Sequence, residues 1–216
     1  MKVLGINGSP RTGGNTDLLL DKVLAGAAAS GAVTEKILLN TLKFAPCQEC
    51  TGMPDDGICI INDELQAVYR KIAQADVIIL TSPIFFGSLS AQTKMMIVRY
   101  QCLWRAKYLL KSPCIPLLQR GIRRIRKAGV FISVEASHRQ DFFANASSIV
   151  KNFFATINAD YTEEILVSGV AEKGSILKHP EILQRAFDLG IEIGNRDSDH
   201  FFVGISFVGA QFIAPE

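Results

Sequence analysis

Short apolar runs that alternate with longer amphipathic segments constrain the fold of this chain more than any other feature. Runs suited to buried strands lie at residues 3–6, 33–39, 77–80, 129–134 and 164–167. Helical periodicity follows each run, beginning near Asn15, Asn62, Ser90, Asp141 and Pro180, with the third helix expected over 90–110. This alternation predicts a doubly wound α/β domain with helices on both faces of a five-stranded parallel sheet of order 2-1-3-4-5.

Particular residue types mark the expected helix ends. Asn15, Asn62 and Asp141 are residues that commonly cap a helix N-terminus. Pro180 suits the first position of the last helix, which should end near Gly194. These signals place the loops that follow the strands, and those loops are where ligands bind in such sheets.

No repeat or linker divides the 216 residues. We therefore expect one domain over residues 1–196, with a cysteine-containing insertion at about 45–61. An apolar C-terminal extension over 197–216 is expected to serve in packing or in contacts between subunits.

Composition excludes several classes of function. With 23 basic and 21 acidic side chains the net charge is only +2, which argues against a nucleic-acid partner. No apolar run reaches the ~18 residues that a membrane-spanning helix needs, so no membrane partner is expected. The N-terminus lacks the pattern of a secretory signal, and five cysteines, an odd number, favour reduced thiols. We expect a cytoplasmic protein.

The loop after the first strand, residues 8–16, consists of small and hydroxyl residues and leads directly into a helix. Backbone N–H groups, the helix dipole, the hydroxyls of Ser9 and Thr16 and the Arg11 guanidinium could together bind one anion, such as a terminal phosphate. The loop is not a Walker A motif, because Asn15 and Thr16 stand where that motif requires Gly-Lys-Ser/Thr. It also lacks the G-x-G-x-x-G pattern of dinucleotide-binding folds. A plain Gly-rich turn remains the alternative.

The loop after the third strand contains two adjacent aromatic residues, Phe85 and Phe86. Exposed aromatics at a sheet edge either pack on the domain, contact another subunit or face a flat ligand. Strands one and three are neighbours at the point where the strand order reverses. A ligand with its phosphate in the first loop would therefore bring its ring to this second loop.

Both loops resemble those of the flavodoxin-like NAD(P)H-dependent FMN reductases, a group that includes the iron–sulfur flavoproteins. The resemblance rests on Ser9-Pro10-Arg11, Gly14-Asn15-Thr16, residues 82–91 and Lys94, and it covers roughly residues 1 to 195. It implies noncovalent FMN, with the phosphate bound by Ser9, Arg11, Gly14, Asn15 and Thr16. The same resemblance assigns the isoalloxazine ring to Pro83, Ile84, Phe85, Phe86 and Gly87.

The resemblance also implies an activity. NAD(P)H would pass hydride to flavin N5, and a small acceptor such as a quinone or a flavin would then take it, with no catalytic side chain required. The alternative is a flavoprotein electron carrier that is reduced by a protein partner. A third hypothesis, a signalling or scaffold domain without flavin, is disfavoured because the strand ends lack the acidic residues of a receiver domain. Members of this family commonly form homodimers or homotetramers, and we expect the same here.

Three cysteines fall on the pattern of the iron–sulfur flavoproteins, C-x2-C-x2-C-x5-C. Cys47, Cys50 and Cys59 occupy three of the positions, and Met53 replaces the third cysteine. A [4Fe–4S] cluster is held by four thiolates, and a thioether is a poor substitute. We therefore predict no metal site. A redox pair of Cys47 and Cys50, a zinc site completed by Asp55 or Asp56, and a loop that merely packs all stay open.

Charged residues lie in and before the loop after the fourth strand. Glu135 beside a flavin would oppose an anionic reduced form, while His138 or Arg139 could offset it. A surface loop with solvated charges is the alternative. A basic cluster precedes this strand and forms either a solvated face or a site for the 2′-phosphate of NADPH or for an acidic partner; it comprises Arg120, Arg123, Arg124, Arg126 and Lys127.

Overall fold

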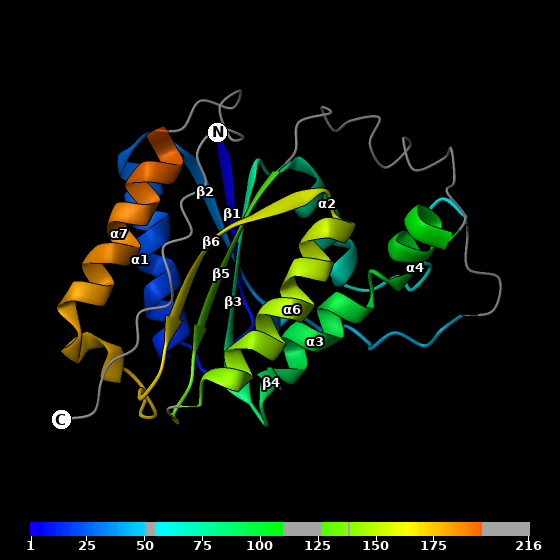
Figure 1. The fold of residues 1–216 in the computed structure, drawn as a ribbon. Coiled ribbons are helices and arrows are strands. Elements are labelled where there is room, and N and C mark those ends of the chain that lie inside the picture. The colour runs from blue at the N-terminus through cyan, green and yellow to red at the C-terminus, as the bar shows by residue number, and fades with distance from the viewer. Residues whose placement is uncertain (51–54, 110–126, 138, 196–216) are drawn as a thin grey trace.

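A computed structural model of the chain describes residues 1–50, 55–109, 127–137 and 139–195. Its centre is a twisted sheet of parallel strands in the order β2-β1-β3-β5-β6 (Figure 1). The strands are β1 (Lys2–Asn7), β2 (Val33–Leu38), β3 (Val77–Phe85), β5 (Lys127–Val134) and β6 (Ala159–Val167). The predicted parallel α/β fold and its strand order are confirmed. A sixth strand, β4 (Ser88–Leu89), pairs antiparallel with the end of β3, and two residues are too few for a sequence pattern to reveal.

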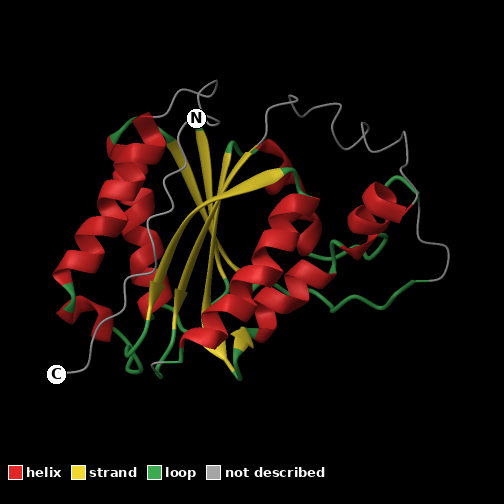
Figure 2. Cartoon of the chain, in the orientation of Figure 1, coloured by secondary structure: helices red, strands yellow, loops and turns green. Residues whose placement is uncertain are grey.

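Helices cover both faces of the sheet (Figure 2). One face carries α1 (Asn15–Ala29) and α7 (Pro180–Asn195). The other face carries α2 (Leu65–Gln74), α3 (Ala91–Val98) and α6 (Gln140–Thr156), with the short α4 (Gln101–Trp104) beyond them. Shorter helical turns lie at η1 (Leu39–Thr41), η2 (Arg105–Leu109) and η3 (Ser175–Lys178). Within the described residues, no helix has both the length and the apolar character that crossing a membrane requires.

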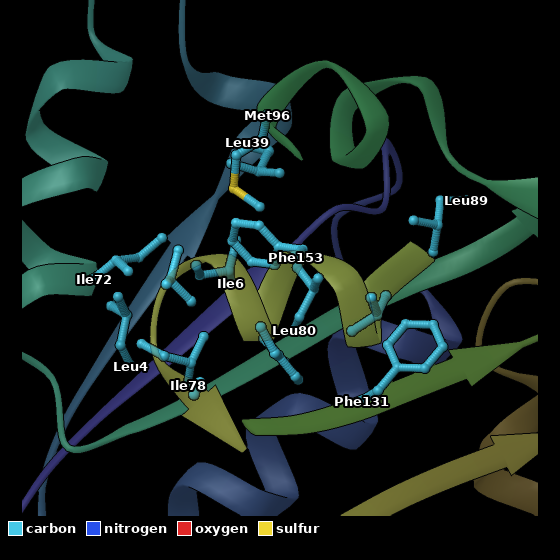
Figure 3. Close-up of a cluster of buried hydrophobic side chains, with 14 of the residues drawn as sticks. Leu4, Ile6, Leu39, Ile72, Ile78, Leu80, Leu89, Met96, Phe131 and Phe153 are labelled. Atoms are coloured by element: carbon cyan, nitrogen blue, oxygen red, sulfur yellow. The ribbon is translucent and has the colours of Figure 1, made fainter. Parts of the chain in front are cut away.

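Alternating side chains of the strands form two apolar clusters, one on each face. Figure 3 shows the cluster under α2, α3 and α6, where Ile78 and Leu80 of β3 meet Phe153 and Met96. Val77 and Ile79 point the other way, toward α1 and α7. A strand buried on both faces reads as a continuous apolar run, which is why residues 77–80 were the clearest strand signal in the sequence.

Three predicted N-caps are wrong by one or two residues. Gly14, not Asn15, precedes α1, and the Asn15 side chain makes no capping bond. Glu64 precedes α2 in place of Asn62, although the Asp63 carboxylate accepts a hydrogen bond from the Leu65 N–H at 3.1 Å. Asp141 lies inside the first turn of α6. The side chains of Asn15 and Asp141 bond to other partners, Asn15 to the segment after β6 and Asp141 to Arg139.

The single helix expected over 90–110 is interrupted. Ser90 caps α3 by accepting a hydrogen bond from the Thr93 N–H at 3.3 Å, and α3 then ends at Val98. Arg99 and Tyr100 lie at the break and both are buried. The Arg99 carbonyl accepts a hydrogen bond from the Tyr69 hydroxyl at 3.0 Å. Because Arg99 and Tyr100 both face inward here, the apolar face does not continue along one helix as the periodicity predicts.

Lys127, from the predicted basic cluster, is buried and does not belong to a solvated face. Its ammonium donates hydrogen bonds to the carbonyls of Ala73 and Ala75, at 2.8 and 2.5 Å, at the C-terminal end of α2. Burial lowers the pKa of this ammonium, and the charge of Asp76 opposes that shift. Lys127 therefore stabilises a helix end, as cations do at the negative end of the helix dipole. The four arginines of the cluster lie outside the described residues.

Candidate functional site

The carboxyl ends of the parallel strands gather at one edge of the sheet, the lower edge in Figure 1. There Asn7 of β1 pairs in register with Thr81 of β3. Two residues further along β3, Pro83 pairs with Val134 of β5. The loops that follow β1 and β3 are therefore neighbours, as the strand order predicts.

Asn7, the last residue of β1, organises the first loop. Its side-chain oxygen accepts hydrogen bonds from the Ser9 N–H at 2.9 Å and from the Thr81 hydroxyl at 3.2 Å. Its amide nitrogen donates to the Asp17 carboxylate at 2.8 Å. With only 1% of its surface exposed, Asn7 links both strands to the helix that follows. These buried hydrogen bonds of Asn7 therefore determine the shape of the loop.

Asp17, in the first turn of α1, completes this support. Its carboxylate accepts a hydrogen bond from the Gly13 N–H at 2.7 Å and pairs with the Lys36 ammonium at 2.6 Å. The side chain is 4% exposed, so these bonds are shielded from water. Neither Asn7 nor Asp17 was a predicted site residue. A polar residue ending a strand, with an acid in the first helical turn after it, is the signal that could have revealed them.

The open side of the first loop carries donors for an anion. Arg11 and Thr12 are exposed, whereas Ser9, Gly14 and Thr16 are buried. The Ser9 hydroxyl accepts a hydrogen bond from the Arg11 N–H at 3.1 Å, which closes the turn. The first N–H groups of α1 have no partners within the helix and point toward the loop. This arrangement suits a phosphate group.

Asn15 has a different role from the one its loop position suggests. Its amide donates hydrogen bonds to the carbonyls of Val170 and Glu172, at 3.3 and 2.9 Å, and its oxygen accepts one from the Ile176 N–H at 3.2 Å. The side chain is thus occupied in tying the segment after β6 to the first loop. Only the backbone N–H of Asn15 remains suited to an anion.

The second loop is a two-residue hairpin turn. Phe85 pairs with Ser88, and the two residues between them, Phe86 and Gly87, have φ angles of 50° and 70°. Positive φ at both central positions is the type I′ geometry, which glycine and asparagine prefer. Phe85 is 41% exposed and the Phe86 side chain is fully exposed. The turn therefore holds an aromatic side chain in solvent at a conformational cost.

The hairpin turn is fixed on both sides. A Cβ atom on Gly87 would lie 2.9 Å from the Phe142 ring, and the Asn145 amide donates a hydrogen bond to the Gly87 carbonyl at 2.9 Å. On the other side, the Ser90 hydroxyl donates to the Gly8 carbonyl at 2.6 Å. That last bond joins the two loops directly. The site is thus one hydrogen-bonded unit that spans β1 and β3.

Replacing Phe86 with glycine is expected to stabilise the ligand-free protein by roughly 1 kcal/mol, because glycine adopts positive φ without the strain that phenylalanine carries. Urea unfolding would show this as a higher midpoint with an unchanged slope. Phe85→Gly is the matched control, because Phe85 lies in β3 and has no positive φ. It should lose stability. A loss of stability in Phe86→Gly would show that the exposed ring makes contacts of its own.

The loop after β5 combines a buried and an exposed charge. Glu135 is 3% exposed and its carboxylate accepts a hydrogen bond from the Ser137 hydroxyl at 3.4 Å, so it is not a solvated charge. Arg139 is exposed, pairs with Asp141 at 2.7 Å and lies over the Phe142 ring at 4.3 Å. His138 lies outside the described residues. The structure therefore separates Glu135, an interior group, from Arg139, a surface group beside the second loop.

The predicted cysteine insertion lies away from this edge, beside α4. Cys47, Cys50 and Cys59 are half-buried free thiols. Among the residues that the structure describes, no three His, Cys, Asp or Glu side chains are placed to hold a metal ion. Met53 lies outside those residues. Behind the loop, the Arg99 guanidinium forms an ion pair with Asp63 at 2.6 Å.

The Arg99–Asp63 pair predicts an acid-sensitive contribution to stability. Burial opposes ionisation of Asp63, but hydrogen bonds and the charge of Arg99 outweigh it, so its pKa is lowered below the ordinary 3.8. A carboxylate with a lowered folded-state pKa adds stability above its unfolded pKa and loses it as the pH falls through the folded value. We expect Asp63→Asn to be less stable than wild type at pH 7, with the difference shrinking below about pH 4. Urea unfolding at both pH values measures this. A difference independent of pH would contradict the ion pair.

Comparisons with known proteins agree with this geometry. Residues 1–142 match the family described as NADPH-dependent FMN reductase. The chain is 44% identical to an iron–sulfur flavoprotein of Methanocaldococcus jannaschii over 194 residues, which are 89% of this chain and 95% of that protein. It is 34% identical to an iron–sulfur flavoprotein of Methanosarcina thermophila over 112 residues, 52% of this chain and 59% of that protein.

A solved structure shares the fold over nearly the whole chain. It is a flavone reductase with a TM-score of 0.69 and 22% identity, and the alignment covers 98% of this chain and 66% of that chain. At this identity the likeness concerns the fold alone, whereas the family match covers residues 1–142, a range that includes both loops. The chain belongs to the NADPH-dependent FMN reductase family, as a flavin-dependent oxidoreductase that uses FMN with NAD(P)H as co-substrate.

Proposed function

We propose that this protein passes hydride from NAD(P)H through FMN to a small acceptor such as a quinone or a free flavin. The observation that carries the proposal is the direct link between the two loops, in which the Ser90 hydroxyl donates to the Gly8 carbonyl at 2.6 Å. The link fixes the loop suited to a phosphate against the loop suited to a ring. A flavin mononucleotide has this combination of groups.

We propose that the first loop binds the FMN phosphate. The contacts would come from the hydroxyls of Ser9 and Thr16, the Arg11 guanidinium and the N–H groups of Gly14 and Asn15. The N-terminus of α1 favours a negative charge at this point. Arg11 is exposed, so it can swing over the phosphate without a buried charge being left unpaired in the free protein.

We propose that the second loop borders the isoalloxazine ring. Pro83, Ile84 and Gly87 would offer backbone groups, and Phe85 and Phe86 would offer aromatic surface. The exposure of both phenylalanines supports this, because a fully exposed Phe86 on a strained backbone is costly unless a ligand or a subunit covers it. We expect the covering to come in part from a second subunit, in a homodimer or homotetramer.

The chemistry of such a site lies mainly in the cofactor. When bound between the two loops, FMN would supply the hydride chemistry that links NAD(P)H to the acceptor. The protein residues bind, orient and shield. The turn at Phe86 and Gly87, which Asn145 and Phe142 hold in place, would border the ring, and the buried Asn7 and Asp17 support the phosphate loop. No side chain is assigned as an acid or base.

Replacing Arg11 with alanine is expected to weaken FMN binding about 10- to 100-fold, because a charge-assisted hydrogen bond contributes roughly 1.5–3 kcal/mol. Fluorescence titration of the apoprotein with FMN measures this. Arg70→Ala, which removes an exposed arginine on α2, is the matched control and should leave the affinity unchanged. Equal affinity in Arg11→Ala and wild type would remove Arg11 from the phosphate site.

The activity itself is tested on the purified protein under anaerobic conditions. We expect flavin absorption near 450 nm and its rapid bleaching by NADPH or NADH, with recovery on adding a quinone or free FMN. Protein that takes up no FMN would overturn the proposal. Bleaching only by a ferredoxin-like protein donor would favour the electron-carrier alternative instead.

A further inference from the structure

We infer that the described parts of the cysteine loop, residues 45–50 and 55–63, are assembled around the buried guanidinium of Arg99, and that the loop holds no iron–sulfur cluster. The relatives of this chain are iron–sulfur flavoproteins, so a cluster in this loop is the expectation to be examined. The inference concerns the loop and does not depend on the proposed acceptor.

Arg99 bonds to both ends of the loop. Its Nη1 donates to the Asp63 carboxylate at 2.6 Å and to the Ala45 carbonyl at 2.8 Å. Its Nη2 donates to the Ile61 carbonyl at 3.2 Å, and its Nε donates to the Cys59 sulfur at 3.2 Å. The Arg99 side chain has no exposed surface. A buried cation requires this many partners, and here it joins the start of the loop to its end.

The loop also packs against α4 and the turn after it. A Cβ atom on Gly57 would lie 3.1 Å from the Leu103 side chain and 3.3 Å from the Ala106 Cβ, so the backbone there lies directly on the helix. The Arg105 guanidinium pairs with Asp55 at 3.3 Å. These contacts fix the middle of the loop, while Arg99 fixes its ends. The described residues of the loop, 45–50 and 55–63, are therefore held by contacts that require no metal.

The cysteines of the loop do not supply the four thiolates that a [4Fe–4S] cluster takes. The fifth cysteine of the chain, Cys114, lies outside the described residues. Cys47, Cys50 and Cys59 supply three, and Met53 occupies the remaining position of the sequence pattern. Cys59 presents its sulfur to the Arg99 Nε–H.

Cys102 is a poor substitute for the missing ligand. It is buried, and its thiol lies 3.5 Å from the Arg99 carbonyl, to which it donates. Burial, together with the charge of Cys59, raises the pKa of the Cys102 thiol to about 12. A ligand must lose that proton to bind iron. Without a cluster, electrons would leave reduced flavin only by direct contact with an acceptor.

Anaerobic reconstitution of the holoprotein with ferrous iron and sulfide tests the inference. We expect less than about one-tenth of the four iron atoms that a cluster needs per chain, and no paramagnetic cluster signal after reduction with dithionite. Four irons per chain with that signal would overturn the inference. Flavin content is measured separately, so loss of FMN, which bears on the proposed function, cannot be mistaken for absence of a cluster.

Two sets of variants test separately the missing fourth cysteine and the role of Arg99 in organising the loop. Met53→Cys restores the four-cysteine pattern and is expected to take up iron where wild type does not. Iron uptake by wild type at the level of this variant would overturn the inference. Arg99→Met should make the loop at least tenfold more sensitive to limited proteolysis, and Asp63→Asn, which keeps the side-chain shape, should do so to a lesser extent. Arg70→Met is the control, since it removes an exposed arginine of α2 that lies outside the loop. Unchanged proteolysis of the loop in both Arg99→Met and Asp63→Asn would show that Arg99 does not organise it.

Discussion

Replacing Gly8 with alanine is expected to weaken FMN binding at least 100-fold and to destabilise the protein by several kcal/mol. A Cβ atom at this position would lie 1.7 Å from the Thr93 hydroxyl oxygen and 2.9 Å from the Thr81 carbonyl oxygen. The second neighbour is backbone and cannot turn away, so the loop must shift. Overpacking of this kind costs typically 1–3 kcal/mol and more where backbone moves. Titration with FMN and urea unfolding measure the two effects.

Gly129→Ala separates the effect on the site from the effect on the fold. Its Cβ would lie 2.4 Å from the Phe154 ring, which places a clash of similar severity in the core, near the start of β5. We expect this variant to lose stability yet to bind FMN normally in its folded fraction. If both variants lost affinity equally, the loss in Gly8→Ala would reflect the fold and not the loop.

The sequence predicted the sheet well because strands that are buried on both faces appear in it as uninterrupted apolar runs. Runs such as residues 77–80 cannot be mistaken for surface, and the alternation of strands and helices then determines the order of the parallel strands. The two-residue strand β4 left no such record. Its presence depends on the positive φ angles of Phe86 and Gly87, and phenylalanine is not a residue from which that geometry is predicted.

The sequence predicted residues on the solvent-facing side of the candidate site. It did not predict the buried residues that support the first loop. Ser9, Arg11 and Thr16 stand in a motif, so a local reading finds them. Asn7 and Asp17 act through contacts between β1, β3 and α1, which become visible only when the chain is folded. Asn15 likewise has side-chain partners that a local reading cannot find, because they lie in residues 170–176, more than 150 positions away.

Arg99 illustrates a further limit of periodicity. An arginine within an amphipathic run is expected to face solvent, since a buried charge is costly without partners. Here the partners come from the cysteine loop, tens of residues earlier in the chain, and the helix ends where Arg99 turns inward. The break in the helix could be predicted only if the contacts between Arg99 and the cysteine loop were already known.

Replacing Asp17 with alanine is expected to weaken FMN binding tenfold or more and to destabilise the protein by about 2–6 kcal/mol, because two donors would each lose a buried acceptor at a cost of roughly 1–3 kcal/mol. The Gly13 N–H and the Asn7 amide would each lose a buried acceptor, and the phosphate loop would lose its fixed shape. FMN titration and urea unfolding again measure both quantities.

Asp21→Ala is a closely matched control for this prediction. Asp21 lies one turn further along α1 and pairs with the same Lys36 ammonium, also at 2.6 Å, but its side chain is 54% exposed and it makes no described contact with the loop. Exposed ion pairs contribute only about 0–1 kcal/mol, so this variant should remain near wild type in stability and in FMN affinity. If Asp21→Ala matched Asp17→Ala, the effect would come from Lys36 and not from the support of the loop. If Asp17→Ala alone bound FMN weakly, a carboxylate that never touches the cofactor would be shown to position the groups that do.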